Sequence, residues 1–181
     1  MNLPNKLTVI RMILIIPFVV LMMMGGDRTT RYVALAIFII ASVTDWFDGY
    51  LARKNHLVTN FGKFMDPLAD KLLVCSAMIC LVAEGSLPAW VVIIIISREF
   101  VISGFRLIAS DNGIVIAASW WGKFKTTSQM LMIILLILNL GENIYVFAVL
   151  EQVFIWLALI LTVISLVDYI VKNKQVIRMQ E

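Results

Sequence analysis

Charged residues are scarce in this chain of 181 residues: they make up 15% of it, whereas apolar residues make up 61%. Soluble domains are about 25% charged and roughly 45–50% apolar, so the composition excludes an ordinary water-soluble domain. Cysteine is nearly absent as well. Cys75 and Cys80 are the two in the chain and lie in one apolar run, which excludes a disulfide framework and a cysteine zinc site.

Six apolar runs fill most of the chain, separated by clusters of glycine, proline and polar residues. A bilayer-spanning helix needs about 20 residues, so the length allows six spans and leaves none for a second domain. We therefore expect an all-α polytopic membrane protein with six transmembrane helices and a single domain over residues 1–181. The expected spans cover residues 10–24, 32–45, 68–83, 88–108, 120–140 and 146–171, and the polar stretch from Asp45 to Arg53 continues the second helix.

The lysine and arginine residues fix the expected orientation. They gather at the N-terminus, between the second and third spans, between the fourth and fifth, and after the sixth, whereas the connections after the third and fifth spans carry none. Positive charge is typical of cytoplasmic loops. Both termini are therefore expected in the cytoplasm, and we interpret Arg28 and Arg31, after the first span, as topological residues.

Four of the twelve acidic residues fall within one short stretch of the chain. Asp45 and Asp48 are three apart and share a face of the second helix, while Asp66 and Asp70 are four apart and share a face of the third. The connection between these helices is short, so the two acidic faces can converge at the cytoplasmic side. Clustered carboxylates repel one another, and hard divalent cations prefer oxygen ligands. We therefore expect two divalent cations here, an arrangement that suits displacement at phosphorus.

The spacing of these aspartates and of the small residues between them resembles the signature of the CDP-alcohol phosphotransferase family. The eight matching positions are Asp45, Asp48, Gly49, Ala52, Arg53, Gly62, Asp66 and Asp70. The resemblance implies a six-helix membrane enzyme, usually a homodimer, with its active site at the cytoplasmic face of the cell membrane. It also implies attack of an alcohol on a CDP-linked lipid, with release of CMP.

The same resemblance implies roles for individual residues. Asp45, Asp48, Asp66 and Asp70 would bind two divalent cations, Mg²⁺ or Mn²⁺, and Asp70 would also be the catalytic general base. The contacts to the CDP-lipid would come from Asn5, Thr8, Asp48, Gly49, Ala52, Arg53, Gly62 and Lys63.

Three further segments narrow the acceptor alcohol. Residues 4–8, 97–106 and 121–129 are similar to segments of the bacterial phosphatidylglycerophosphate synthases, a branch of this family that transfers the phosphatidyl group of CDP-diacylglycerol to glycerol 3-phosphate. The acceptor phosphate would be held by Arg98, Arg106, Lys123 and Lys125, which an uncharged acceptor would not need. Two alternatives to phosphate binding stay open. The two lysines could be ordinary positive residues at the cytoplasmic side, and Arg98 could have a structural role. Glu99 is expected to point away from Arg98, because adjacent helix residues do not face each other.

Other functions are compatible with parts of this pattern. Inositol phosphate, serine or phosphatidylglycerol are acceptors of related enzymes. Membrane prenyltransferases also bind a diphosphate through Mg²⁺ and aspartates, but they usually have more spans. A carrier or channel would spread its acidic residues along a path through the bilayer, whereas here they crowd at one face.

Overall fold

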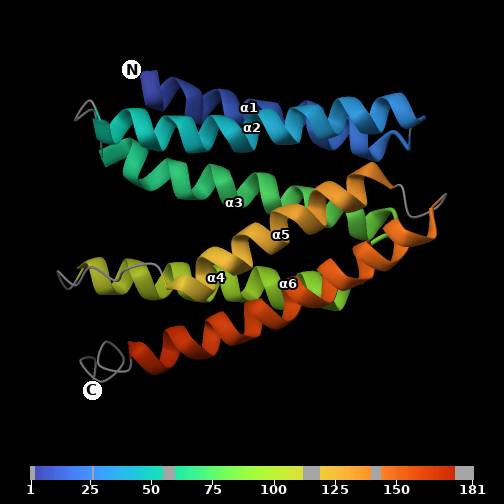
Figure 1. Cartoon of the computed structure of the whole chain (residues 1–181). Coiled ribbons are helices and arrows are strands. Elements are labelled where there is room, and N and C mark those ends of the chain that lie inside the picture. The colour runs from blue at the N-terminus through green and yellow to red at the C-terminus, as the bar shows by residue number, and fades with distance from the viewer. Residues whose placement is uncertain (1–2, 26, 55–59, 112–118, 140–143, 174–181) are drawn as a thin grey trace. The chain divides into compact units, whose positions relative to one another are not determined.

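The computed structural model consists of helices joined by turns in the part of the chain that it describes. It describes residues 3–25, 27–54, 60–111, 119–139 and 144–173, and their side chains except those of 3–5, 45–54, 60–64 and 111. Over these ranges the chain forms six α-helices and no strand (Figure 1). The helices are α1 (Leu3–Met23), α2 (Arg28–Lys54), α3 (Asn60–Ala83), α4 (Ala89–Asp111), α5 (Trp120–Leu138) and α6 (Tyr145–Lys172).

Each of the six expected spans overlaps one of these helices, and several helices extend beyond the apolar run; residue 140, the last of the fifth expected span, lies outside the described residues. α2 continues to Lys54, which confirms that the polar stretch after Asp45 belongs to the second helix. α3 begins at Asn60, eight residues before the predicted span. Hydropathy marks the part of a helix that suits lipid, whereas hydrogen bonding continues into polar sequence, so the two boundaries differ.

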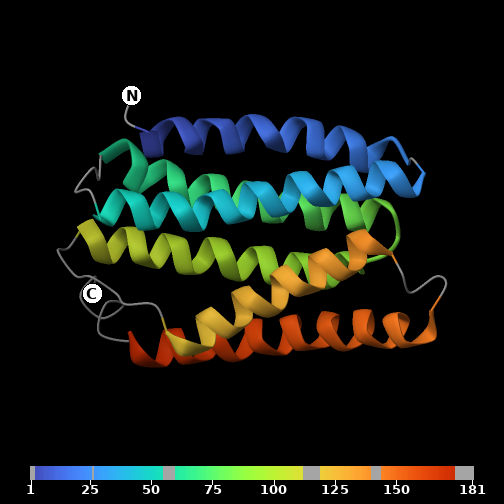
Figure 2. The same cartoon turned by 45° about the horizontal axis from the view of Figure 1, so that its top comes forward.

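The first compact unit, Met1–Ser86, contains α1, α2 and α3. α1 packs against both of the other helices, and Figures 1 and 2 show the three side by side. Phe18 of α1 and Phe38 of α2 are fully buried, with ring centroids 5.8 Å apart. Ala34 and Ala41 of α2 are also fully buried, and such small side chains let helix backbones approach closely.

Polar contacts fix the ends of these helices where the chain turns. The hydroxyl and backbone amide of Thr30 donate to the Asp27 carboxylate, at 2.9 and 3.2 Å, and cap the start of α2. The bonds from Thr30 lower the pKa of Asp27 below its ordinary value. Arg31 pairs with Glu84 just beyond α3, at 3.1 Å and half-buried. Arg31 was interpreted as topological alone, and this ion pair corrects that interpretation.

The second compact unit, Leu87–Glu181, contains α4, α5 and α6. α6 packs against both α4 and α5. Aromatic pairs mark the contact of α4 with α6: Trp90 with Trp156, at 6.0 Å between ring centroids, and Phe105 with Tyr169, at 6.4 Å. Ser119 caps the start of α5 by accepting a hydrogen bond from the Gly122 amide.

Two of the described helices are long and apolar enough to cross a membrane. They are α1, over Lys6–Met23, and α6, over Tyr145–Lys172. The other four combine exposed apolar side chains, such as Ile40 in α2 and Ile93 in α4, with more charge. The six-span topology, the orientation and the single domain stay predictions.

Candidate active site

Two of the four predicted metal ligands lie on α3, one helical turn apart. Asp66 and Asp70 are both half-buried, and fully buried Ala69 lies between them on the side that packs into the first unit. The Thr8 hydroxyl of α1 donates a hydrogen bond to Oδ1 of Asp66 over 2.5 Å. Thr8 itself is 1% exposed. A buried hydroxyl from one helix therefore orients a carboxylate of another.

The remaining signature residues lie on α2 and α3, where the structure describes the backbone but not the side chains. The backbone of α2 runs through residues 45–53, and that of α3 through 62 and 63, so the one-turn spacing of the signature is helical as predicted. The side chains that lie outside the described part are those of Asn5, Asp45, Asp48, Gly49, Ala52, Arg53, Gly62 and Lys63. Among the described residues no group of three or more histidine, cysteine, aspartate or glutamate side chains comes together. The convergence of four carboxylates thus stays a prediction.

Arg11 of this unit was expected only to be one of the N-terminal cations that fix the orientation, and its burial was not predicted. It lies three residues after Thr8, on the same face of α1, and is 1% exposed. An arginine is almost never fully buried unless it is paired. The signal was present in the sequence, because Arg11 is a charged residue inside the first apolar run.

The second unit contains a buried cluster of charges, built around Glu99 of α4. Oε1 of Glu99 accepts from Nζ of Lys125 in α5 and, at 3.0 Å, from Nη1 of Arg98. The other terminal nitrogen of Arg98, Nη2, donates to the Ser165 hydroxyl of α6. We call Arg98, Glu99, Lys125 and Ser165 the Glu99 cluster. One carboxylate faces two cations, so the cluster keeps one net positive charge.

The pairing of Glu99 with Arg98 corrects the expectation that the two side chains point apart. Adjacent residues do project from a helix in different directions at Cβ. The arginine stem is long enough, however, to bring its guanidinium back to the neighbouring carboxylate. Burial favours the ion pairs with Glu99, because Arg98 is 9% and Lys125 is 2% exposed and a buried cation is costly without a partner.

The other two predicted phosphate-binding cations are exposed. Lys123 lies over the ring of Trp120, with Nζ 5.0 Å from the ring centroid. Arg106, near the end of α4, lies within electrostatic range of the hydroxyl of Tyr169, as does Arg98. The structure thus joins Arg98 and Lys125 through Glu99 and associates Arg106 with Tyr169. Ser165 and Tyr169 were not predicted, although both are polar residues in the last apolar run.

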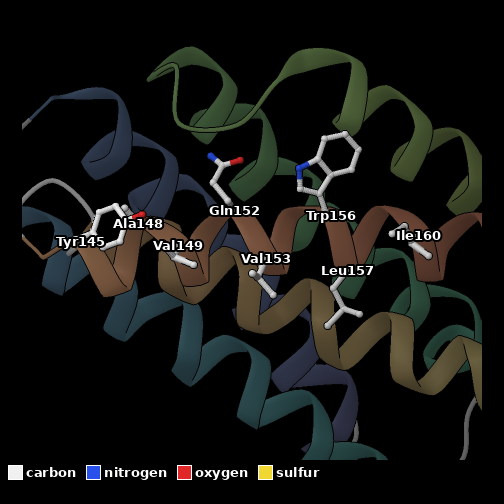
Figure 3. A pocket seen from close by; sticks show the side chains of 8 residues that line it. All are labelled: Tyr145, Ala148, Val149, Gln152, Val153, Trp156, Leu157 and Ile160. Atoms are coloured by element: carbon white, nitrogen blue, oxygen red, sulfur yellow. The ribbon is translucent and has the colours of Figure 1, made fainter.

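A shallow hollow of about 590 Å³ runs along the opposite end of α6, between Tyr145 and Ile160 (Figure 3). All eight of its lining side chains come from α6, and none is charged. It therefore lacks the groups needed to bind a phosphate or a metal ion, and we do not assign it to the active site.

The profile of the family described as CDP-alcohol phosphatidyltransferase matches residues 1–164. The chain belongs to this family. The matched segment includes the whole signature from Asp45 to Asp70 and both Glu99 and Lys125. It ends within α6, one residue before Ser165.

Curated CDP-alcohol phosphatidyltransferase relatives resemble the chain over nearly its full length. The CDP-diacylglycerol–glycerol-3-phosphate 3-phosphatidyltransferase of Bacillus subtilis strain 168 is 46% identical, over 98% of this chain and 97% of the relative. The protein of the same name from Haemophilus influenzae is 41% identical, over 93% and 91%. A probable phosphatidylglycerophosphate synthase of Mycobacterium tuberculosis H37Rv is 43% identical, over 94% of this chain and 81% of the relative.

Proposed function

We propose that the chain transfers the phosphatidyl group of CDP-diacylglycerol to glycerol 3-phosphate, forming phosphatidylglycerophosphate and CMP. The observation that carries this proposal is the similarity to relatives that bear the name of this reaction, over more than nine-tenths of the chain. The family assignment also decides against the prenyltransferase and carrier alternatives. Inositol phosphate, serine and phosphatidylglycerol remain the competing acceptors within the family.

The proposed setting is the cell membrane, crossed six times, with both termini and the active site at the cytoplasmic face and two chains forming a homodimer. The membrane-capable helices α1 and α6 support a membrane location. Exposed apolar side chains on the remaining helices suit contact with lipid tails. The distribution of lysine and arginine supports the orientation, and the family resemblance supports the homodimer.

The proposed cofactors are two divalent cations, Mg²⁺ or Mn²⁺, held by Asp45, Asp48, Asp66 and Asp70. The described half of this set fits such a role, because Asp66 and Asp70 offer hard oxygen donors one turn apart. Thr8 occupies Oδ1 of Asp66 and leaves its other oxygen outside that bond. When bound, the cations would neutralise the diphosphate and the charge that develops on the departing CMP.

The proposed chemistry needs no covalent enzyme intermediate. A hydroxyl oxygen of glycerol 3-phosphate attacks the phosphorus that carries the diacylglycerol, and the bond from this phosphorus to the bridging oxygen breaks. CMP leaves with that oxygen, and Asp70 accepts the proton of the attacking hydroxyl. The protein's contribution is largely the positioning of these groups and the stabilisation of charge.

The acceptor phosphate is proposed to bind to the cations of α4 and α5. Arg106 and Lys123 are exposed and so accessible to a charged ligand. Arg98 and Lys125 are buried, and the Glu99 cluster as a whole contributes one net positive charge. An uncharged acceptor would gain nothing from this group of cations.

An acceptor panel tests the proposal directly. The full-length protein, purified in detergent or lipid nanodiscs, is given CDP-diacylglycerol and each acceptor in turn, and CMP release is measured together with the mass of the lipid product. Glycerol 3-phosphate is expected to give phosphatidylglycerophosphate at a rate well above that with serine, inositol phosphate or phosphatidylglycerol. A faster reaction with any of those three would identify a different acceptor and refute the proposal.

A further inference from the structure

The Thr8 hydroxyl makes an unusual contact for a threonine in a helix. Helical threonines commonly donate to the carbonyl four residues earlier, and among the described residues Thr44, Thr126, Thr127 and Thr162 do so. Thr8 donates to the carboxylate of Asp66, 58 residues later in the sequence. This hydroxyl therefore links α1 to a second helix, α3.

Burial makes the bond between Thr8 and Asp66 specific. Thr8 is 1% exposed, so water has little access to replace its hydroxyl. A threonine hydroxyl can donate a hydrogen bond, and the Thr8 hydroxyl donates one to Asp66 Oδ1. Fixing one carboxylate oxygen also fixes the direction of the other, which is how an outer partner orients a metal-ligating side chain.

We propose that Thr8 is a positioning residue that holds the Asp66 carboxylate in the geometry needed to bind a divalent cation. This inference rests on the proposed metal site. It replaces the direct contact to the CDP-lipid that the family resemblance implied for Thr8. Its consequence is that α1, which carries none of the four aspartates, determines the cation affinity of a ligand on α3.

The experiment compares three single variants of the full-length purified protein. Thr8→Val removes the hydroxyl and keeps the side-chain shape, and Thr8→Ser keeps the hydroxyl. Thr162→Val is the matched control, because Thr162 is also 1% exposed but its hydroxyl donates to Ala158 of its own helix. Mn²⁺ is titrated into each protein without substrate, and free Mn²⁺ is measured by electron paramagnetic resonance. The KM for CDP-diacylglycerol is measured in parallel at saturating Mn²⁺.

Loss of an outer partner typically weakens metal binding by about 10–100-fold, and we expect this loss for Thr8→Val. Thr8→Ser and Thr162→Val should bind Mn²⁺ like the unaltered protein. In the background of Asp66→Asn, adding Thr8→Val should cause no further loss, because the group through which Thr8 acts is already altered. This comparison holds even if Thr8→Val lowers the stability of the protein.

Three results would overturn the inference. Unchanged Mn²⁺ affinity in Thr8→Val, with a raised KM for CDP-diacylglycerol, would make Thr8 a substrate contact. A loss of Mn²⁺ affinity that is equally large with and without Asp66→Asn would show that Thr8 acts elsewhere. Absence of Mn²⁺ binding in the unaltered protein would instead refute the metal site of the proposed function, and with it the role of Thr8.

Discussion

Replacing Glu99 by glutamine is expected to destabilise the second unit by about 3 kcal/mol. The carboxylate of Glu99 contacts Nζ of Lys125 and Nη1 of Arg98, whose side chains are 2% and 10% exposed. Removing one partner of a buried ion pair costs about 3–5 kcal/mol, because a charge is left buried without compensation. The lower end applies here, since the Glu99 side chain is 20% exposed and a glutamine carbonyl can still accept a hydrogen bond.

Thermal unfolding in detergent, followed by circular dichroism, measures this effect. For a chain of this size, 1 kcal/mol corresponds to about 2–4 °C, so the melting temperature of Glu99→Gln should fall by about 6–12 °C. The matched control is Lys172→Gln. Lys172 pairs with Asp168 at 2.7 Å on the same unit, but its side chain is 63% exposed, so its loss should cost at most about 1 kcal/mol.

A second substitution distinguishes charge pairing from packing. Adding Lys125→Met to Glu99→Gln removes one of the two cations that lost the Glu99 carboxylate and keeps a side chain of similar length. The double variant should therefore recover part of the lost stability, a coupling that independent sites would not show. A melting temperature of Glu99→Gln within about 2 °C of the unaltered protein, or a double variant less stable than the single one, would refute the reasoning.

Three further predictions concern catalysis. Excess chelator should abolish CMP release and added Mg²⁺ or Mn²⁺ should restore it, whereas full activity in chelator would exclude the metal site. Arg106→Ala should raise the KM for glycerol 3-phosphate more than that for CDP-diacylglycerol, because a charge-assisted contact to phosphate is lost; equal effects would mean that the acceptor binds elsewhere. Asp70→Asn should lower kcat by about 10²–10⁴-fold while CDP-diacylglycerol still binds. Normal turnover would show that Asp70 is not the general base. Loss of CDP-diacylglycerol binding would show that Asp70 is chiefly a metal ligand.

The sequence predicted local features of the candidate site well. The spacing of Asp66 and Asp70 placed them one turn apart on a helix, and α3 has both on it. The polar stretch after Asp45 was expected to be helical, and α2 includes it. These predictions succeeded because they depend on helical periodicity, which a few neighbouring residues determine. The helix starts were less accurate, since hydropathy does not mark where α1 and α3 begin in polar sequence.

Contacts between distant residues were beyond the sequence. Thr8 and Asp66 are 58 residues apart, and Lys125 is 26 residues from Glu99, so no local period relates them. The expectation that Glu99 points away from Arg98, which came from a local rule, was wrong. The rule describes where Cβ atoms project, whereas the observed pair depends on a long side chain and on the burial of its charge.

The bond between Arg98 and Ser165 shows why the family profile alone does not identify every residue that contacts the cations proposed to bind the acceptor. Ser165 accepts the bond from Arg98 and is fully buried, yet it lies one residue beyond the segment matched by the family profile, which ends at 164. Tyr169, within electrostatic range of Arg98 and Arg106, lies further beyond it. The signature on α2 and α3 lies within the matched segment. Ser165 of α6 contacts Arg98, one of the cations proposed to bind the acceptor phosphate, so we expect this end of the chain to influence acceptor specificity.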